Sequence, residues 1–246
     1  IACFAAPGSA DVSADEGWVI NRLDLQYTVR SNGAVEALES IDVDFRDLSR
    51  HGIFRDITRL QQFDDTHNRE YGIDLIAVVD GRDRRQDVDV LEEGANRRFK
   101  IGSASRTISG LQSYRIGYLL TGVLNAFPDH DEFFWNATGI WPVAIDHAVV
   151  RVRVPQAGVT RVECFQGFQG STERCDSHMT GDEATFAATR ALSAGEQLTI
   201  VTSIRKGVVS EPKPVLARRA RDPLHYFERT PLWGNVSIAG AGLAIA

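Results

Sequence analysis

Residues 129–155 read DHDEFFWNATGIWPVAIDHAVVRVRVP, the most informative stretch of the chain. Aromatic side chains lie between an acidic cluster and a run that is rich in Val and Ile. Because β-branched residues favour extended structure, residues 143–154 are predicted to form a central strand. The preceding residues 125–139 are predicted to form a loop, with one helical turn near Asp131.

Upstream, residues 18–30 alternate apolar with polar side chains, and residues 35–46 alternate again. Asn32-Gly33 lies between them, and both residues tolerate the positive φ of a tight turn. The pattern predicts a long antiparallel hairpin with one buried face. Further short strands are predicted at residues 71–79, 88–92, 97–101, 107–108, 114–120, 160–165, 184–189 and 197–204.

Residues 50–57 have neither a strand period nor a helix period, and they are predicted to form an ordered loop pinned by Ile53, Phe54 and Ile57. Many short strands separated by Gly-containing turns are typical of a sandwich or a barrel. We therefore expect residues 17–206 to form an all-β domain, an antiparallel β-sandwich of about ten strands.

The composition is that of an ordinary globular protein, with 43% hydrophobic and 24% charged residues. The formal net charge of −6 gives no reason to expect nucleic acid as a partner. Residues 1–14 are small and apolar, which suits the remnant of a secretory signal peptide. Alternatively, this segment is a disordered tail, or Cys3 is the acylated residue of a lipoprotein.

Towards the C-terminus, a basic, Pro-containing segment precedes an apolar one. Residues 207–231 are predicted to be a linker, and residues 232–246 the start of a truncated transmembrane helix with Trp233 at the membrane interface. The alternative is a short apolar tail that packs on the domain. A basic flank usually lies in the cytoplasm, but a cleaved signal commits the following domain to export. We therefore expect the domain on the extracytoplasmic side of the cell membrane.

Cys164 and Cys175 lie close together in a Gly-rich stretch. An exported chain meets an oxidising compartment, so we expect the two to form a disulfide. A zinc site would need more Cys or His ligands at suitable spacing, and only His178 is near in sequence. No metal and no cofactor are expected.

Two segments resemble motifs of a known family. Residues 51–57, HGIFRDI, are similar to the HGI(Y/F)RDI motif of DUF2207, a bacterial family of predicted membrane proteins of unknown function. Residues 134–145 are similar to a second segment of that family, through Trp135, Asn136, Gly139 and Trp141.

The resemblance covers residues 18–206, and the Cys164 and Cys175 pair resembles the usual Cys pair of the family. It implies a signal peptide, an extracytoplasmic β domain, transmembrane helices and a cytoplasmic tail. It implies no known activity, so no catalytic residues are carried over.

Two groups in residues 129–141 have the chemistry of a site. The acidic cluster at residues 129–132 would bind a divalent metal through its carboxylates, but it lacks the ligand spacing of a calcium loop. A solvated, helix-starting turn is the alternative. The aromatic group either stacks on a sugar or grips a peptide, or else fills the core; it consists of Phe133, Phe134, Trp135 and Trp141.

A third group comprises His51, Arg55 and Asp56. These residues would form an acid–base site if Asp146 or His147 came within hydrogen-bond reach. Alternatively, Arg55 and Asp56 form a structural ion pair that braces a loop.

Two functions fit these residues. The first is a membrane-anchored binding module for a partner protein or an envelope polymer, and the second is a hydrolase that acts on envelope polymers through acidic and His residues. The sequence has no nucleophile elbow, zinc-protease or phosphate-loop motif, which favours the module. Residues 51–57 are expected to pack beside residues 134–141, with Arg55 paired with an acid. The candidate binding surface is His51, Phe54, Arg55, Asp56, Trp135, Asn136 and Trp141.

Overall fold

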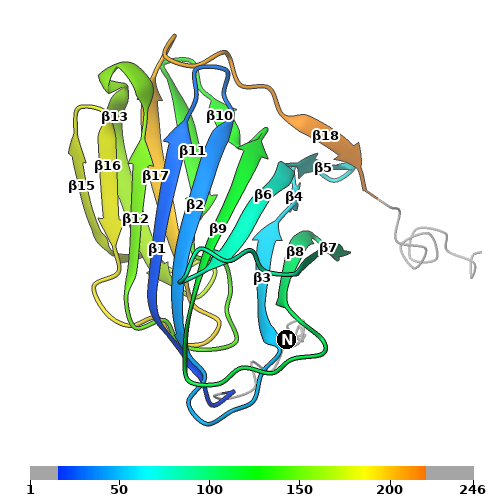
Figure 1. The fold of residues 1–246 in the computed structure, drawn as a ribbon. Coiled ribbons are helices and arrows are strands. Elements are labelled where there is room, and N and C mark those ends of the chain that lie inside the picture. Colours follow the sequence, from blue (N-terminus) through cyan, green and yellow to red (C-terminus); the bar gives the residue numbers. More distant parts are fainter. Residues whose placement is uncertain (1–15, 220–246) are drawn as a thin grey trace, which may run out of the picture.

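The computed structural model describes residues 16–219 of the protein (Figure 1). The predictions for residues 1–14, including Cys3, and for residues 232–246 lie outside the described residues. Residues 16–219 form an all-β fold of eighteen strands and one short 3-10 helix, η1 (Pro155–Ala157). No helix in this part of the chain has the length and hydropathy that crossing a bilayer requires.

The largest sheet has seven strands, and its spatial order is β15-β16-β12-β1-β2-β9-β6. All neighbours in it are antiparallel except β1 and β12, which run parallel. In spatial order, the strands are β15 (Asp176–Thr180), β16 (Glu183–Ala187), β12 (Ala148–Arg153), β1 (Val19–Val29), β2 (Val35–Asp44), β9 (Leu111–Thr121) and β6 (Gly72–Asp80).

Three smaller antiparallel sheets complete the fold. The five-stranded sheet consists of β10 (Leu124–Ala126), β11 (His130–Asn136), β17 (Gln197–Arg205), β13 (Val159–Gly167) and β14 (Glu173–Arg174). One three-stranded sheet, called the small sheet below, consists of β3 (Gly52–Thr58), β8 (Asn96–Gly102) and β7 (Val88–Glu93). The other consists of β18 (Val215–Arg218), β5 (His67–Glu70) and β4 (Leu60–Gln62).

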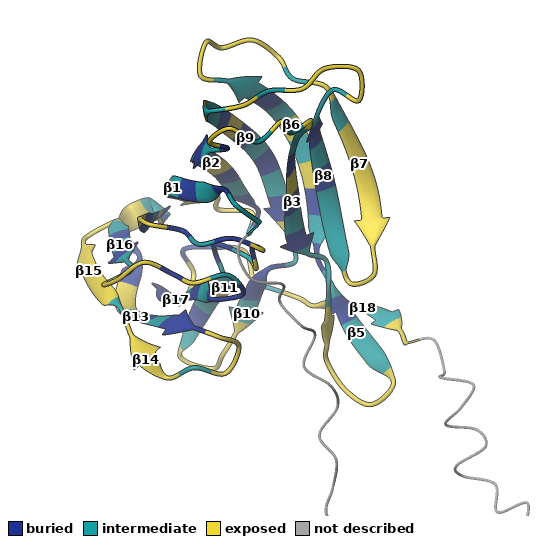
Figure 2. Ribbon diagram, turned by 90° about the horizontal axis from the view of Figure 1, so that it is seen from below, coloured by how far each residue is buried: buried dark blue, intermediate teal, exposed yellow. Residues whose placement is uncertain are grey.

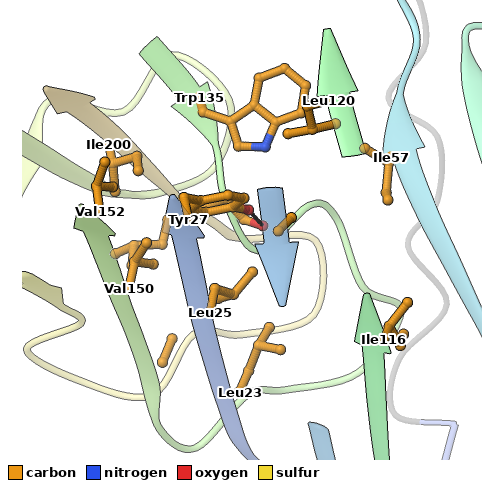
Figure 3. Close-up of a cluster of buried hydrophobic side chains, with 14 of the residues drawn as sticks. Leu23, Leu25, Tyr27, Ile57, Ile116, Leu120, Trp135, Val150, Val152 and Ile200 are labelled. Carbon is orange, nitrogen blue, oxygen red and sulfur yellow. Dashed lines mark hydrogen bonds between the residues drawn. The ribbon is translucent and has the colours of Figure 1, made fainter. Parts of the chain in front are cut away.

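The five-stranded sheet and the small sheet both cover the same face of the seven-stranded sheet (Figure 2). Between the seven-stranded and the five-stranded sheet, the ring centres of Tyr27 of β1 and Phe133 of β11 lie 5.4 Å apart, edge to face. Between the seven-stranded sheet and the small sheet, the ring centres of Phe99 of β8 and Tyr118 of β9 lie 5.9 Å apart. Figure 3 shows Tyr27 among buried side chains from several strands. The core therefore lies between one large sheet and two smaller ones.

The hairpin of β1 and β2 confirms the prediction from the alternating pattern. The apolar residues Leu23, Leu25 and Tyr27 share the buried face. At the turn, the side chain of Asn32 accepts a hydrogen bond from the backbone N–H of Ala34 at 3.1 Å, and Gly33 has a φ of +84°. An apolar face and a turn that permits positive φ thus fix this hairpin together.

Four local predictions are wrong. Residues 50–57 are not a loop, because most of them form strand β3. Residues 125–139 have no helical turn near Asp131, because β10 and β11 pair as a hairpin there. The strand predicted at residues 143–154 is shorter, since β12 spans Ala148–Arg153. The strand predicted at residues 107–108 is absent, because Ile108 forms an isolated bridge with Arg50.

The overall architecture also differs in detail from a simple antiparallel sandwich of about ten strands. The number of strands is larger, and β12 brings a parallel pair into the large sheet. Part of the segment predicted as a linker is a strand, because β18 pairs with β5. Pairing of this kind satisfies backbone groups that a free linker would leave to water.

Gly52 and Gly102 face each other across β3 and β8, and neither position has room for a side chain. A Cβ atom on Gly52 would lie 1.8 Å from the carbonyl oxygen of Ile101, and the φ of Gly52 is +146°.

We expect Gly52→Ala to lower the free energy of unfolding by about 2 kcal/mol or more, measured by denaturant titration. Gly94→Ala is the control, with a φ of +59° and open space around it, and should cost about 1 kcal/mol. Equal losses in the two variants would contradict the steric argument.

Candidate functional site

Strand β3 sends its side chains alternately to two faces, as the pleat of a strand requires. Ile53, Arg55 and Ile57 are buried against the large sheet. Phe54 is 56% exposed, and Asp56 is half-buried on the same outer face. The family motif therefore has an interior half and a surface half.

Arg55 is a buried cation whose hydrogen bonds are met by protein groups. Its Nε donates to Glu39 Oε2 at 2.8 Å, and its Nη2 donates to Glu39 Oε1 at 2.7 Å. Nη2 also donates to the carbonyl oxygen of Ala137 at 3.1 Å, and Nη1 to that of Asp56 at 2.8 Å. Both charged side chains are almost fully buried. A two-point ion pair with additional carbonyl acceptors offsets the cost of removing the two charges from water.

Two tyrosines complete this group, which we call the Arg55 cluster: Arg55, Glu39, Tyr27 and Tyr118. The hydroxyl of Tyr118 donates to Glu39 Oε1, and that of Tyr27 donates to the carbonyl of Ala137 at 3.4 Å. Burial by itself lowers the pKa of the Arg55 guanidinium, but the Glu39 carboxylate outweighs burial and raises it. Burial, and then the charge of Glu39, raise the pKa of Tyr118 well above its ordinary value. The Arg55 guanidinium therefore stays charged beside the neutral phenol of Tyr118.

The turn after β11 is shaped to receive Arg55. Gly139 has a φ of +68°, and a Cβ atom there would lie 2.3 Å from Arg55 Nη1. The backbone N–H of Gly139 donates to Asn136 Oδ1 at 3.2 Å, and Trp141 Nε1 donates to the carbonyl of Thr138 at 2.8 Å. The guanidinium of Arg55 lies 5.8 Å from the centre of the Trp141 ring. The prediction that the two motif segments pack together, with Arg55 paired with an acid, is confirmed.

The seven residues predicted as a binding surface do not form one exposed patch. Arg55, Trp135 and Trp141 are buried, so as they stand they contact protein rather than solvent. Asn136 is half-buried, and its amide donates to the side chain of Gln197. His51 is exposed at the start of β3. The surface prediction is wrong for the buried three. Alternation along β3 and β11 turns Arg55 and Trp135 inward, and Trp141 is buried in the segment that follows β11.

The sequence reasoning missed the partners of Arg55. Glu39 lies in phase with the buried face of β2, between Ala37 and Ile41, at a position where an apolar residue would be expected. A lone carboxylate on an apolar face is a signal of a buried ion pair, because an unpaired charge there is very costly. That signal predicts a buried cation but does not say which of the many Arg residues supplies it.

The outer face of the small sheet is the surface counterpart of the Arg55 cluster. Register places Phe54 opposite Lys100 and Asp56 opposite Arg98, with Leu91 beyond Arg98 on β7. Arg98 forms a two-point ion pair with Asp56, both bonds at 2.7 Å, and lies 5.1 Å from the centre of the Phe54 ring. Leu91 is 39% exposed. These residues, Phe54, Asp56, Leu91, Arg98 and Lys100, are called the small-sheet face below.

An acid–base site at His51, Arg55 and Asp56 is not assembled in the structure. Arg55 and Asp56 have separate partners, in Glu39 and Arg98. Asp146 and His147 are exposed and form no hydrogen bond or ion pair with these residues within the described chain. The alternative prediction, an ion pair between Arg55 and Asp56 that braces a loop, is also wrong, because Arg55 pairs with Glu39 and Asp56 with Arg98.

The acidic cluster and the cysteines also have defined environments. Asp131 is buried and pairs with Lys206 at 2.6 Å, so it is not part of a solvated turn. Residues 16–219 contain no group of three or more His, Cys, Asp or Glu side chains arranged to hold a metal ion. Cys164 and Cys175 form a disulfide with their Cα atoms 5.2 Å apart, as predicted.

Breaking the Arg55–Glu39 pair should be far more costly than breaking a surface pair. We expect Arg55→Met and Glu39→Gln each to lower the free energy of unfolding by about 3–5 kcal/mol, because each leaves a buried group unpaired. The double variant should lose less than the sum of the two. The half-exposed pair gives the control, since Arg98→Met should cost about 1 kcal/mol or less. Denaturant titration measures all four variants, and strictly additive losses for the double variant would exclude the coupling.

Comparison with solved structures finds a similar fold in a yeast hydrolase and a weaker likeness to a zinc metallopeptidase. Yeast LTA4 hydrolase in complex with bestatin has a TM-score of 0.50 and 10% identity, over 80% of this chain and 31% of that one. An M1 zinc metallopeptidase from Deinococcus radiodurans has a TM-score of 0.43 and 13% identity, over 76% of this chain and 43% of that one. The chain thus spans less than half the length of either enzyme. The TM-score relates the fold of this chain to that of the yeast protein. At 10% identity, the likeness says nothing about activity.

Comparison with curated proteins finds no match. The family model described as "Predicted membrane protein (DUF2207) N-terminal domain" matches residues 19–204. This range contains the β3 motif, the turn after β11 and both disulfide cysteines. The chain belongs to the DUF2207 family of predicted membrane proteins.

Proposed function

We propose that this domain is a binding module, tethered to the membrane and held on its extracytoplasmic side, for an envelope polymer or a partner protein. The small-sheet face is the observation that carries the proposal. It presents an aromatic ring that is 56% exposed, on a strand whose opposite side is fixed by the Arg55 cluster. Rigid, exposed aromatic groups beside cations are favourable anchors for binding, because little conformational entropy is lost.

One observation supports the extracytoplasmic side, and a second supports the membrane anchor. The Cys164–Cys175 disulfide suits an oxidising compartment. The family is one of predicted membrane proteins, which agrees with an anchor beyond residue 219. A secretory signal at residues 1–14 and a transmembrane helix starting in residues 232–246 complete the proposed topology, with the intervening domain exported.

The topology is tested with a reporter thiol at Ala95, an exposed residue at the β7–β8 turn. In Ala95→Cys, a membrane-impermeant maleimide added to intact protoplasts should label the chain as fully as it does after lysis. The parent chain is the control for any labelling of Cys3, since Cys164 and Cys175 are bonded to each other. Labelling of the variant only after lysis would place the domain in the cytoplasm and end this proposal.

The binding surface is tested by photo-crosslinking in intact cells. A photoreactive phenylalanine analogue at position 54 should give a discrete adduct, because this ring is proposed to contact the partner. The same analogue at Phe168, a ring that is 59% exposed in the turn after β13, is the matched control. Digestion of the adduct with glycosidases or with protease separates a polymer from a protein. Adducts of equal yield at both positions, or none at position 54, would contradict a binding role for the small-sheet face.

A further inference from the structure

A polar pocket of about 180 Å³ opens where the β3–β8 end of the small sheet meets β6 and β9. Its lining includes His51, Asp80, Arg84, Arg106 and Tyr114. The volume corresponds to roughly six water molecules' share of the liquid, which suits a single sugar unit rather than a peptide or an acyl chain. Of the motif residues, only His51 reaches it.

Tyr114 provides the first sign that this pocket is built for a ligand. The side chain is 3% exposed, and its hydroxyl has no hydrogen-bond partner in residues 16–219. A buried hydroxyl without a partner is destabilising, so it is commonly satisfied by bound water or by a ligand. Burial, and secondarily the Asp80 carboxylate, raise the pKa of Tyr114 to about 12, which keeps the hydroxyl protonated and able to donate.

The charges around the pocket leave one cation uncompensated. Arg84 is paired with Asp80 at 2.7 Å, and this hydrogen-bonded contact lowers the pKa of Asp80 to about 2. The side chain of Arg106, by contrast, has no ion pair within the described chain. Its guanidinium presents several donors that suit a carboxylate or a phosphate.

His51 adds an acceptor beside these donors. Its Nδ1 lies 3.0 Å from the carbonyl oxygen of Ser103 and 3.1 Å from that of Arg106. Because carbonyl oxygens only accept, Nδ1 carries the hydrogen, and in the neutral ring Nε2 keeps its lone pair. The same contacts hold the backbone of Arg106 at the pocket. The lining therefore combines donors for an oxyanion with an acceptor for a hydroxyl group.

We propose that this pocket binds a sugar-sized hydroxylated ligand that carries one carboxylate or phosphate, with Arg106 and Tyr114 holding the oxyanion and His51 accepting from a hydroxyl. The inference rests on the proposed binding function and specifies the ligand class. An acidic unit of an envelope polymer and a free acidic sugar share this chemistry, and the experiment separates them by chain length.

The experiment titrates the full-length chain in detergent with four probes: glucuronate, glucose 6-phosphate, glucose and a glucuronate trisaccharide. Calorimetry should detect both acidic monomers and no binding of glucose. Arg106→Gln and Tyr114→Phe should each lower the affinity for the acidic probes by about tenfold or more, because each removes a hydrogen bond to a charged group. Arg82→Gln is the control for general charge, since this exposed arginine lies on the Asp80–Arg84 loop but outside the pocket.

A second readout on Tyr114→Phe separates a ligand role from a structural one. If the hydroxyl is kept for a ligand, the melting temperature of the free variant should equal or exceed that of the parent. A lower melting temperature with unchanged affinity would make the hydroxyl structural and overturn the proposal. Equal weakening by Arg82→Gln, or equal binding of glucose, would overturn the oxyanion assignment.

The trisaccharide identifies the source of the ligand. If it binds at least as tightly as glucuronate does, the natural ligand is a unit of a polymer. If the pocket does not bind it, the natural ligand is a free sugar acid. Absence of binding by every probe would end the pocket proposal alone. The position 54 adduct and the labelling of Ala95→Cys would still stand in that case. Conversely, cytoplasmic labelling would end the proposed function while leaving a measured affinity in place.

Discussion

The buried ion pair between Arg55 and Glu39 joins parts of the chain from three sheets. Glu39 belongs to the large sheet, Arg55 to the small sheet, and the carbonyl of Ala137, which Arg55 also contacts, follows β11 of the five-stranded sheet. Apolar packing alone is not directional, whereas a two-point ion pair is satisfied in one geometry only. The pair therefore sets how the two covering sheets lie against the large one.

This arrangement explains why one short motif serves both the interior and the surface. Alternation along β3 places Arg55 on the inside and Phe54 and Asp56 on the outside. Just before the strand, His51 reaches the polar pocket. A rigid interior thus supports two neighbouring features, and rigid support of this kind reduces the conformational entropy that a side chain loses on binding.

Local patterns in the sequence predict the elements whose signals are local. The β1–β2 hairpin follows from an apolar face and Asn32-Gly33, and the disulfide follows from two cysteines that lie close together in sequence and from the expectation of export. The sequence pattern does not predict strand β3, because Arg55 occupies an inward position, where a charged residue suggests a loop. Similarly, the pattern does not predict β11, because the charge of Asp131, which is buried, suggests a solvated turn. In both cases the partner, Glu39 or Lys206, is distant in sequence, so only the fold reveals that the charge is paired.

The pairing of β18 with β5 has a mechanical consequence. The backbone N–H of Arg219 donates to the carbonyl of Thr66 at 2.9 Å, and Arg218 pairs with His67. In Figure 1, β18 lies on the opposite side of the molecule from β15. Tension applied beyond Arg219 would act on the hydrogen bonds between β18 and β5 one after another, beginning at Arg219. If the chain is anchored beyond residue 219 as proposed, β18 would therefore be the first strand to detach under tension.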